Sequence, residues 1–287
     1  MIVDLFQYFK AHPKYNKVVG DDYLIVEYKC PINSEEFQLW TESNMITYVI
    51  SGKKDWIAPD KTYEITGGDA LFIRKGVYST KQHFEVEYCV ILFFMTDDFI
   101  RSFINEHRQI KATKIPSKDF EQIFEIAVDD SFQSLILSVF NYLQQNQDIP
   151  QELIEIKFKE LLFNIILNPK NYHLTQYFKS LEQTIKVNYE QIMLKNFQYD
   201  LKIEDFAKLC NTSLSTFKRE FKTQFGDTPA NWLKQKRLEY ATSLLTNTNL
   251  NVNEVCYESG FKNASHFNKA FKQKYKLTPN QFRLKNT

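Results

Sequence analysis

Cysteine is scarce in this sequence, and its spacing does not suggest chemistry. The four cysteines among 287 residues are Cys30, Cys89, Cys210 and Cys256, and no two have Cys-x-x-Cys spacing. This argues against a disulfide framework and against a zinc site, and it predicts small apolar core residues. The N-terminus also lacks a basic stretch followed by a long apolar one, so we expect no signal peptide and a reducing, cytoplasmic location.

Long hydrophobic runs are missing as well. The longest apolar run, from Cys89 to Met95, has seven residues, whereas a membrane-spanning helix needs about 20. The run therefore predicts a buried strand, and we expect no membrane partner.

Net charge is almost absent, at +1, which by itself argues against a nucleic-acid partner. The distribution of the charge changes that conclusion. Residues 1–178 hold 18 Lys and Arg against 25 Asp and Glu, a net charge of −7, and residues 179–287 hold 18 against 10, a net charge of +8. An asymmetry of this kind predicts an acidic module joined to one that meets an anionic partner, and the chain length suits about two domains.

Glycine is also sparse, and five of the seven glycines fall between Gly20 and Gly76. The same region carries short apolar or alternating segments separated by turn residues, which is typical of a barrel or sandwich. The segments read as strands are Tyr23–Tyr28, Met45–Ile50 and Ala70–Ile73, and a long run from Phe84 to Met95 follows.

From about Pro116 the apolar period becomes helical. We expect one helix in which Phe120, Ile123, Phe124, Ala127 and Val128 share a face, a second over 132–143, a third over 150–167, and a bridging helix over 175–196. The apolar stripe of the third helix is either core or the interface of a homodimer. Its members are Leu153, Ile154, Lys157, Phe158, Leu161 and Leu162.

An internal repeat lies near the C-terminus. The segment Ser215–Lys222 recurs as Ser265–Lys272 at an offset of 50 residues, and Thr228-Pro229 recurs as Thr278-Pro279. A duplicated unit explains this match better than coincidence does.

Each copy reads as a helix-turn-helix, over about 201–225 and 251–275. In the first copy Asn211 tolerates the left-handed turn and Ser213 is a good N-cap. In the second, Asn251 caps the first helix, Gly260 makes the turn and Asn263 caps the next helix. The outer faces of the two second helices carry small polar and cationic side chains, which suit the major groove of duplex DNA.

The stretch from Gly260 to Pro279, with its glycine-aromatic turn, Phe267-x-x-x-Phe271 spacing and closing Thr-Pro, resembles the arabinose-regulator (AraC/XylS) family of bacterial transcription factors. The resemblance covers Leu181 to Arg283. Lys276 departs from it, because the family has glycine after this helix, and this predicts a less tightly turned helix end.

The resemblance implies base contacts and phosphate contacts on both recognition helices, without indicating which helix dominates. The implied base contacts are Ser215, Lys218, Arg219, Ser265, His266 and Lys269. The implied phosphate contacts are Lys222, Asn268 and Lys272.

The N-terminal region, through Val49–Gly52 and Gly68–Gly76, is similar to the family's cupin-like regulatory barrel. Metal-dependent cupins carry a His-x-His pair, which the five histidines here do not form, and Tyr78 stands where related barrels often have histidine. We therefore expect no metal and no cofactor. The side chains expected to line an effector pocket, unless they are core, are Trp40, Tyr48, Tyr78 and His83.

Together these features predict an α+β chain, with a cupin-like β-barrel over 1–112, a helical dimerisation segment over 113–178, and an all-α DNA-binding domain over 179–287. The predicted function is a sequence-specific transcriptional regulator, and the family resemblance implies an activator more than a repressor. Its expected partners are duplex DNA, a second copy of the chain, RNA polymerase, and a small molecule or protein effector. The alternative is a cupin-type enzyme or small-molecule-binding protein with an accessory basic helical domain.

Overall fold

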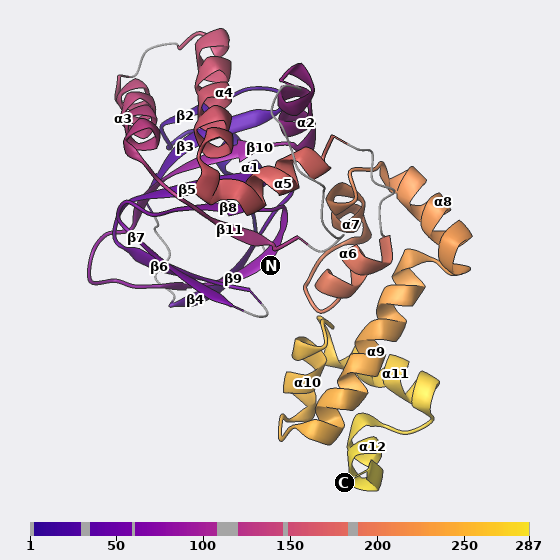
Figure 1. Ribbon diagram of the computed structural model, residues 1–287. Coiled ribbons are helices and arrows are strands. Elements are labelled where there is room, and N and C mark those ends of the chain that lie inside the picture. Colours follow the sequence, from indigo (N-terminus) through magenta and orange to yellow (C-terminus); the bar gives the residue numbers. More distant parts are fainter. Residues whose placement is uncertain are drawn as a thin grey trace. The chain divides into compact units, whose positions relative to one another are not determined.

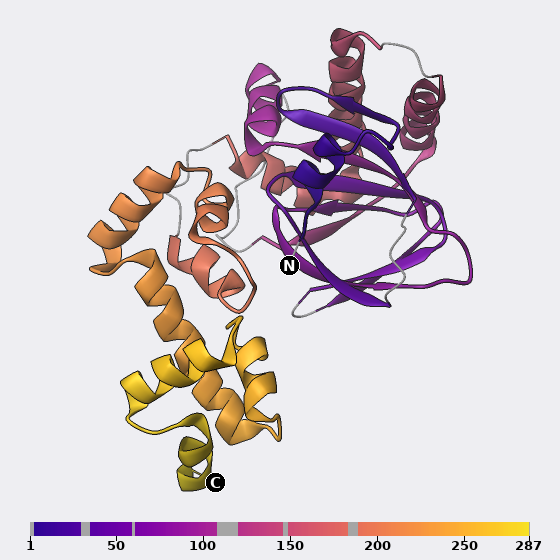
Figure 2. The same cartoon turned by 180° about the vertical axis from the view of Figure 1, so that it is seen from behind.

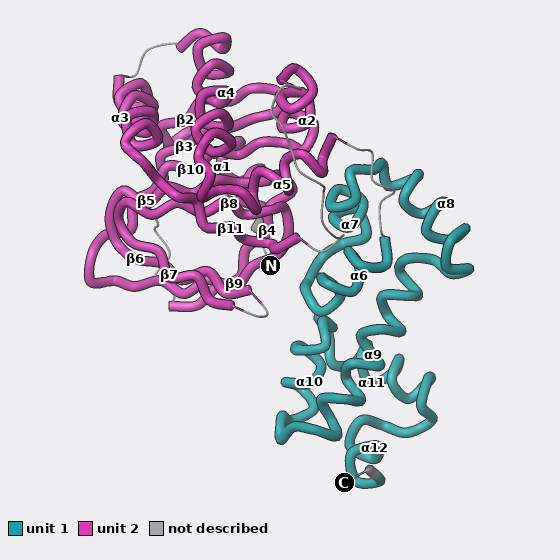
Figure 3. The backbone as a smooth tube through the Cα atoms, in the orientation of Figure 1, with its two compact units in different colours: residues 1–2, 187–287 teal, residues 3–186 magenta. Residues whose placement is uncertain are grey.

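The computed structural model of the protein describes residues 3–29, 35–58, 61–107, 120–145, 149–182 and 189–286. The chain forms two compact units, Val3–Lys186 and Val187–Thr287, coloured magenta and teal in Figure 3. The sequence predicts that the DNA-binding domain starts at residue 179. The boundary predicted at 112/113 lies outside the described residues, as does Cys30. No described helix combines the length and the apolar character needed to cross a bilayer.

The described strands of the first unit belong to two sheets rather than to one closed barrel (Figure 1). The five-stranded sheet has the order β1-β4-β9-β6-β7, and the six-stranded sheet has the order β11-β8-β5-β10-β3-β2. All pairings are antiparallel except that of β1 with β4. The strands are β1 (Val3–Asp4), β2 (Lys17–Val19), β3 (Tyr23–Lys29), β4 (Glu36–Thr41), β5 (Asn44–Ser51), β6 (Lys53–Ile57), β7 (Thr62–Thr66), β8 (Ala70–Ile73), β9 (Gly76–Gln82), β10 (Cys89–Met95) and β11 (Ile123–Ile126).

β10 is apolar throughout because both of its faces are buried. Ile91, Phe93 and Met95 lie in a cluster beneath the helices, and the alternating Val90, Leu92 and Phe94 lie in a second cluster that includes side chains of both sheets. This strand pairs with β3 on one side and β5 on the other. The prediction of a buried strand is confirmed, and the α+β class with it.

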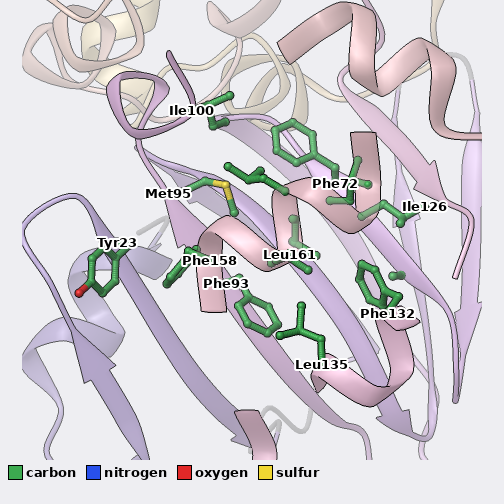
Figure 4. Close-up of a cluster of buried hydrophobic side chains, with 14 of the residues drawn as sticks. Tyr23, Phe72, Phe93, Met95, Ile100, Ile126, Phe132, Leu135, Phe158 and Leu161 are labelled. Carbon is green, nitrogen blue, oxygen red and sulfur yellow. The ribbon is translucent and has the colours of Figure 1, made fainter. Parts of the chain in front are cut away.

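Helices cover the outer face of the six-stranded sheet, and Figure 4 shows the side chains packed between the two layers. The helices of this unit are α1 (Leu5–Ala11), α2 (Asp97–Glu106), α3 (Asp130–Gln144), α4 (Gln151–Leu167) and α5 (Tyr172–Ser180), with a short 3-10 turn at Pro169–Asn171. The helices predicted over 132–143 and 150–167 are thus present as α3 and α4.

The apolar stripe of α4 is core. Its side chains Ile154, Phe158, Leu161 and Leu162 are at most 1% exposed and contact the sheet and neighbouring helices of the same chain. They are therefore not available to a second copy, and the dimer interpretation of these residues is wrong. Leu153 and Lys157 are half-buried, and Lys157 forms an ion pair with Glu160 at 3.0 Å.

Two other helix predictions are corrected. The described part of the segment expected to start near Pro116 forms strand β11, which pairs with β8 through Ile123↔Ile73 and Ile126↔Ala70. The bridging helix is not continuous, because α5 ends at Ser180, with Leu181 as its C-cap, and the next described helix begins at Tyr189.

The second unit is all-helical in its described part. Its helices are α6 (Tyr189–Asn196), α7 (Ile203–Leu209), α8 (Leu214–Phe225), α9 (Pro229–Asn247), α10 (Val252–Glu258), α11 (Ala264–Tyr275) and α12 (Pro279–Asn286). The pairs α7/α8 and α10/α11 are the two predicted helix-turn-helix copies, and α9 links them (Figures 1 and 2). Thr228 caps α9 and Pro229 occupies its first turn, as the repeat predicted.

Candidate nucleic-acid interface

The position of α8 is determined by a short local sequence. Asn211 adopts the left-handed conformation, φ 53°, which ends the first helix. Ser213 then caps α8, with its Oγ accepting from the Thr216 N–H at 3.2 Å. Phe217 and Phe221 are fully buried, and they anchor one face of the helix so that the opposite face meets solvent.

That opposite face carries the predicted DNA contacts. Ser215, Lys218, Arg219 and Lys222 are all exposed. Sequence reasoning gave no role to their neighbour Glu220, which lies 3.8 Å from the Arg219 guanidinium.

Glu220 has a second partner in this unit. It accepts a hydrogen bond from the Tyr189 hydroxyl of α6, and burial together with this bond raises the pKa of Tyr189 to about 12. Tyr189 also packs edge-on against Phe217. The carboxylate is thus held beside Arg219, on the face that sequence reasoning assigned to DNA. The internal repeat gave no indication of the Glu220–Arg219 contact, because the position that matches Glu220 in the second copy is Ala270.

The second copy repeats the design at α11. The Asn263 side chain accepts from the backbone N–H groups of Ser265 (2.8 Å) and His266 (3.1 Å), and Phe267 and Phe271 are fully buried. The first helix of this copy, α10, has the predicted capping box between Asn251 and Glu254. The exposed face of α11 holds Ser265, His266, Asn268, Lys269 and Lys272.

The four side chains expected to form an effector pocket are not brought together. Tyr48 packs on the helix-facing cluster, with its ring 6.1 Å from that of Phe132. Tyr78 lies in the other cluster and donates to the Arg74 carbonyl at 2.5 Å. His83 pairs with Asp55 at 2.9 Å, and Trp40 is a buried residue of β4.

A small cavity lies instead between the two sheets, and none of those four residues lines it. Its volume is about 30 Å³, room for about two water molecules. The lining residues come from α1, from strands of both sheets and, in the case of Tyr88, from the segment before β10. They are Leu5, Phe9, Tyr28, Phe37, Leu39, Met45, Lys54, Trp56, Tyr88, Val90 and Leu92.

Two polar groups set this cavity apart from ordinary core. Lys54 is 3% exposed, and its ammonium lies 4.7 Å from the Phe37 ring centre and 4.6 Å from that of Tyr88. Trp56 Nε1 is buried and has no hydrogen-bond partner among the described residues. The sequence signal that could have pointed to these two residues is the period-two pattern of β6. It places Lys54 on the same face as Trp56 and opposite to Lys53.

The described residues contain no group of three His, Cys, Asp or Glu side chains arranged to hold a metal ion. Cys89, Cys210 and Cys256 are buried and are not disulfide-bonded. Burial raises the pKa of the Cys89 and Cys256 thiols, so these thiols are neutral at physiological pH and behave as small apolar side chains.

The chain is similar to several known proteins. Among solved structures, ToxT from Vibrio cholerae aligns over 93% of this chain and 99% of that one, at 14% identity and a TM-score of 0.43.

Two curated relatives are similar over most of their length. The virulence regulon transcriptional activator VirF of Yersinia enterocolitica is 26% identical over 246 residues, which cover 82% of this chain and 87% of that protein. The transcriptional regulator ExsA of Pseudomonas aeruginosa is 23% identical over 227 residues, which cover 78% and 80%.

Two family models match the chain in succession. The ExsA N-terminal regulatory domain matches residues 44–177, and a helix-turn-helix domain matches residues 206–285. The chain thus has an ExsA-type N-terminal regulatory domain followed by a helix-turn-helix domain of the arabinose-regulator (AraC) type, and it is a DNA-binding transcriptional regulator.

Proposed function

We propose that this regulator activates transcription by placing α8 and α11 in the major groove of promoter DNA. The observation that carries the proposal is the duplication itself: two capped helices present matching polar and cationic faces above a buried phenylalanine pair. Activation is supported by the name of the relative VirF, a transcriptional activator. An activator must also influence RNA polymerase, which we include as a partner.

The side chains divide by their chemistry. Ser, His, Lys and Arg side chains near the start and middle of each helix reach base edges, and we assign this role to Ser215, Lys218, Arg219, Ser265, His266 and Lys269. Side chains farther along or at the flank suit phosphate oxygens, which fix the register without reading sequence. We assign this second role to Lys222, Asn268 and Lys272.

The test is binding of the full chain to duplexes from upstream of its own and neighbouring operons, measured across a salt series. We expect at least one duplex to bind more tightly than random DNA, with affinity falling linearly on a log–log salt plot. Equal affinity for every duplex at every salt concentration would overturn the proposal.

The cavity between the sheets supports a small-molecule effector with an anionic group and an apolar body. The buried Lys54 ammonium would neutralise the anion, and Trp56 Nε1 offers an unused donor. A ligand larger than about two waters has to displace lining side chains. Binding would therefore be coupled to a change in the regulatory unit.

A thermal-shift series tests this with aliphatic and aromatic carboxylates against their primary amides. A carboxylate at about 100 times its Kd should add about 2.7 kcal/mol of stability, its amide clearly less, and Lys54→Met should abolish the difference. Lys53→Met is the matched control, because Lys53 forms an ion pair with Glu64 outside the cavity. If no carboxylate stabilises the chain and a pull-down recovers a bound protein, the effector is a regulatory protein instead.

We also propose that the chain acts as a homodimer, with the contact on the outer sides of α3 and α4. Leu137 is 61% exposed and Ile156 is 58% exposed on these helices, which pack against each other (Figures 1 and 2). The alternative, a cupin-type enzyme or binding protein, would be revived by one stoichiometric transition metal in the purified protein.

A further inference from the structure

The two helix-turn-helix copies are connected by more than the linking helix α9. A second connection joins residues 197–200, which precede α7, to the turn of the second copy around Gly260. We propose that this junction fixes α11 relative to α8 and thereby makes DNA binding selective for the spacing between the two groups of base pairs. The inference rests on the proposed function, in which both helices read DNA.

Arg237 of α9 forms the centre of the junction. Its Nε donates to the Phe197 carbonyl at 2.6 Å, and its Nη2 donates to the Tyr199 carbonyl at 2.7 Å. Burial lowers the pKa of Arg237 to about 10, so the side chain stays charged at neutral pH. The Phe197 ring also packs edge-on against Tyr240, 5.5 Å away on the same helix. The segment before α7 is thus fastened to α9.

Gly260, in the turn of the second copy, packs directly against Arg237 and Gln198. It is buried, it has φ +86°, and a Cβ there would lie 2.8 Å from both Arg237 Nε and the Gln198 carbonyl oxygen. Only glycine allows this approach and this backbone conformation together. At the exposed side of the contact, Lys262 pairs with Asp200 at 2.6 Å. Asn263, the cap of α11, follows directly, so the start of this recognition helix is tied to the segment that leads into α7.

This second connection changes what α9 can do. The helix α9 has 19 residues and is about 28 Å long, and its C-terminal half belongs to the core of the second copy through Leu238, Ala241 and Leu245. Without a further contact, the first copy would be joined to this body only through the N-terminal end of α9, where Phe221 packs against Trp232, and would be free to pivot there. A second contact near the turn removes that freedom. One inserted base pair moves the second contacted group by about 3.4 Å and rotates it by about 35°, and a rigid pair of helices cannot follow that displacement.

The experiment uses the full chain and the duplex that it enriches from a random-sequence pool. Footprinting locates the two contacted groups, and one base pair is then inserted between them. For each protein, affinity for the duplex with the inserted base pair is compared with affinity for the parent duplex. We expect the insertion to lower the affinity of the natural chain about tenfold or more, and that of Arg237→Gln about threefold or less. Arg237→Lys, which keeps the charge and one donor, should recover part of the selectivity.

Arg283→Gln is the matched control. Arg283 of α12 donates to the Leu245 carbonyl near the end of α9 and to the Leu250 carbonyl, away from the junction, so its loss costs stability without opening the junction. Its spacing penalty should stay at about tenfold or more.

Lys262→Ser provides a second test at an exposed position if Arg237→Gln fails to fold, and it should relax the penalty in the same direction. An unchanged penalty in the Arg237 and Lys262 variants would overturn the junction proposal while leaving DNA binding intact. Failure of the natural chain to enrich any duplex would overturn the proposed function instead.

Discussion

Lys276 occupies a backbone conformation that suits glycine. Its φ of 61° matches the 69° of Gly226 at the end of α8, and each residue donates its N–H to the carbonyl four residues earlier at 2.9 Å. The looser helix end expected from the missing glycine is therefore wrong. The capping hydrogen bond and the packing of Phe271, Tyr275 and Phe282 hold the turn, although a Cβ in this conformation costs about 1–2 kcal/mol.

Lys276→Gly should consequently stabilise the protein. We expect the free energy of unfolding to rise by about 0.5–1 kcal/mol, because relief of the left-handed strain exceeds the extra chain entropy of glycine. Denaturant titration monitored by circular dichroism measures the change. Lys276→Ala is the control for lost charge and should give no gain, since it retains the Cβ; an equal gain from alanine would rule out backbone strain as the cause.

Single residues were predictable where the signal is local. Ser213, Asn251 and Asn263 cap their helices as expected, because a cap bonds to backbone groups only two or three positions away. The effector residues were not predictable in this way. Whether Tyr48 and Tyr78 meet depends on which face of which sheet each occupies, and they lie in different clusters.

At the scale of elements, β11 shows how distant pairing overrides a local pattern. Ile123, Phe124 and Val128 fit one face of a helix, and this fit supported the helix prediction. In the fold, Phe124 instead lies opposite Phe72 on β8, about 50 residues earlier, and Ile123 and Phe124 are buried in different clusters. A strand can bury consecutive side chains on its two opposite faces. The periodicity of a short apolar run does not distinguish such a strand from a buried helix.

The recognition helix α8 allows base reading to be separated from phosphate binding. Arg219→Ala should cost about 1–3 kcal/mol on the enriched site and relax its sequence preference, whereas Lys222→Ala should weaken all duplexes similarly and lower the salt slope by about one. Affinities on the enriched site and on random DNA, each across a salt series, measure both effects. Two variants with the same pattern would refute the division of roles.

The contact between Glu220 and Arg219 leads to a further prediction about base discrimination by α8. If its carboxylate positions Arg219, then Glu220→Gln should reduce discrimination between the enriched site and its single-base variants, while a lower negative charge raises affinity for random DNA. Higher affinity with unchanged discrimination would mean that Glu220 acts only through its charge.

At the scale of the whole molecule, the net charge of +1 is the sum of two opposite halves. Residues 179–287, with a net charge of +8, contain both helix-turn-helix copies, and residues 1–178, with −7, contain both sheets and the helices that cover them. Charge, repeat and capping signals therefore located the DNA-binding half from sequence alone. The surface proposed for the dimer contact, in residues 1–178, could not be located from the sequence, because the sequence does not show which side of α4 is buried.

The proposed dimer contact on α3 and α4 has a consequence for DNA binding. Two linked DNA-binding units should bind a duplex with two sites about 10²–10⁴ times more tightly than one site, because the second contact becomes intramolecular. Leu137→Glu combined with Ile156→Glu should give a monomer by sedimentation velocity and remove this advantage, while leaving affinity for a one-site duplex unchanged.

Val86→Glu is the matched control, since Val86 is as exposed as Ile156, at 58%, but lies outside α3 and α4. It should keep both the dimer mass and the two-site advantage. A double variant that still sediments as a dimer would move the interface elsewhere. If the natural chain is monomeric in solution at every concentration, yet retains the two-site advantage, then two protein molecules contact each other only when both are bound to DNA.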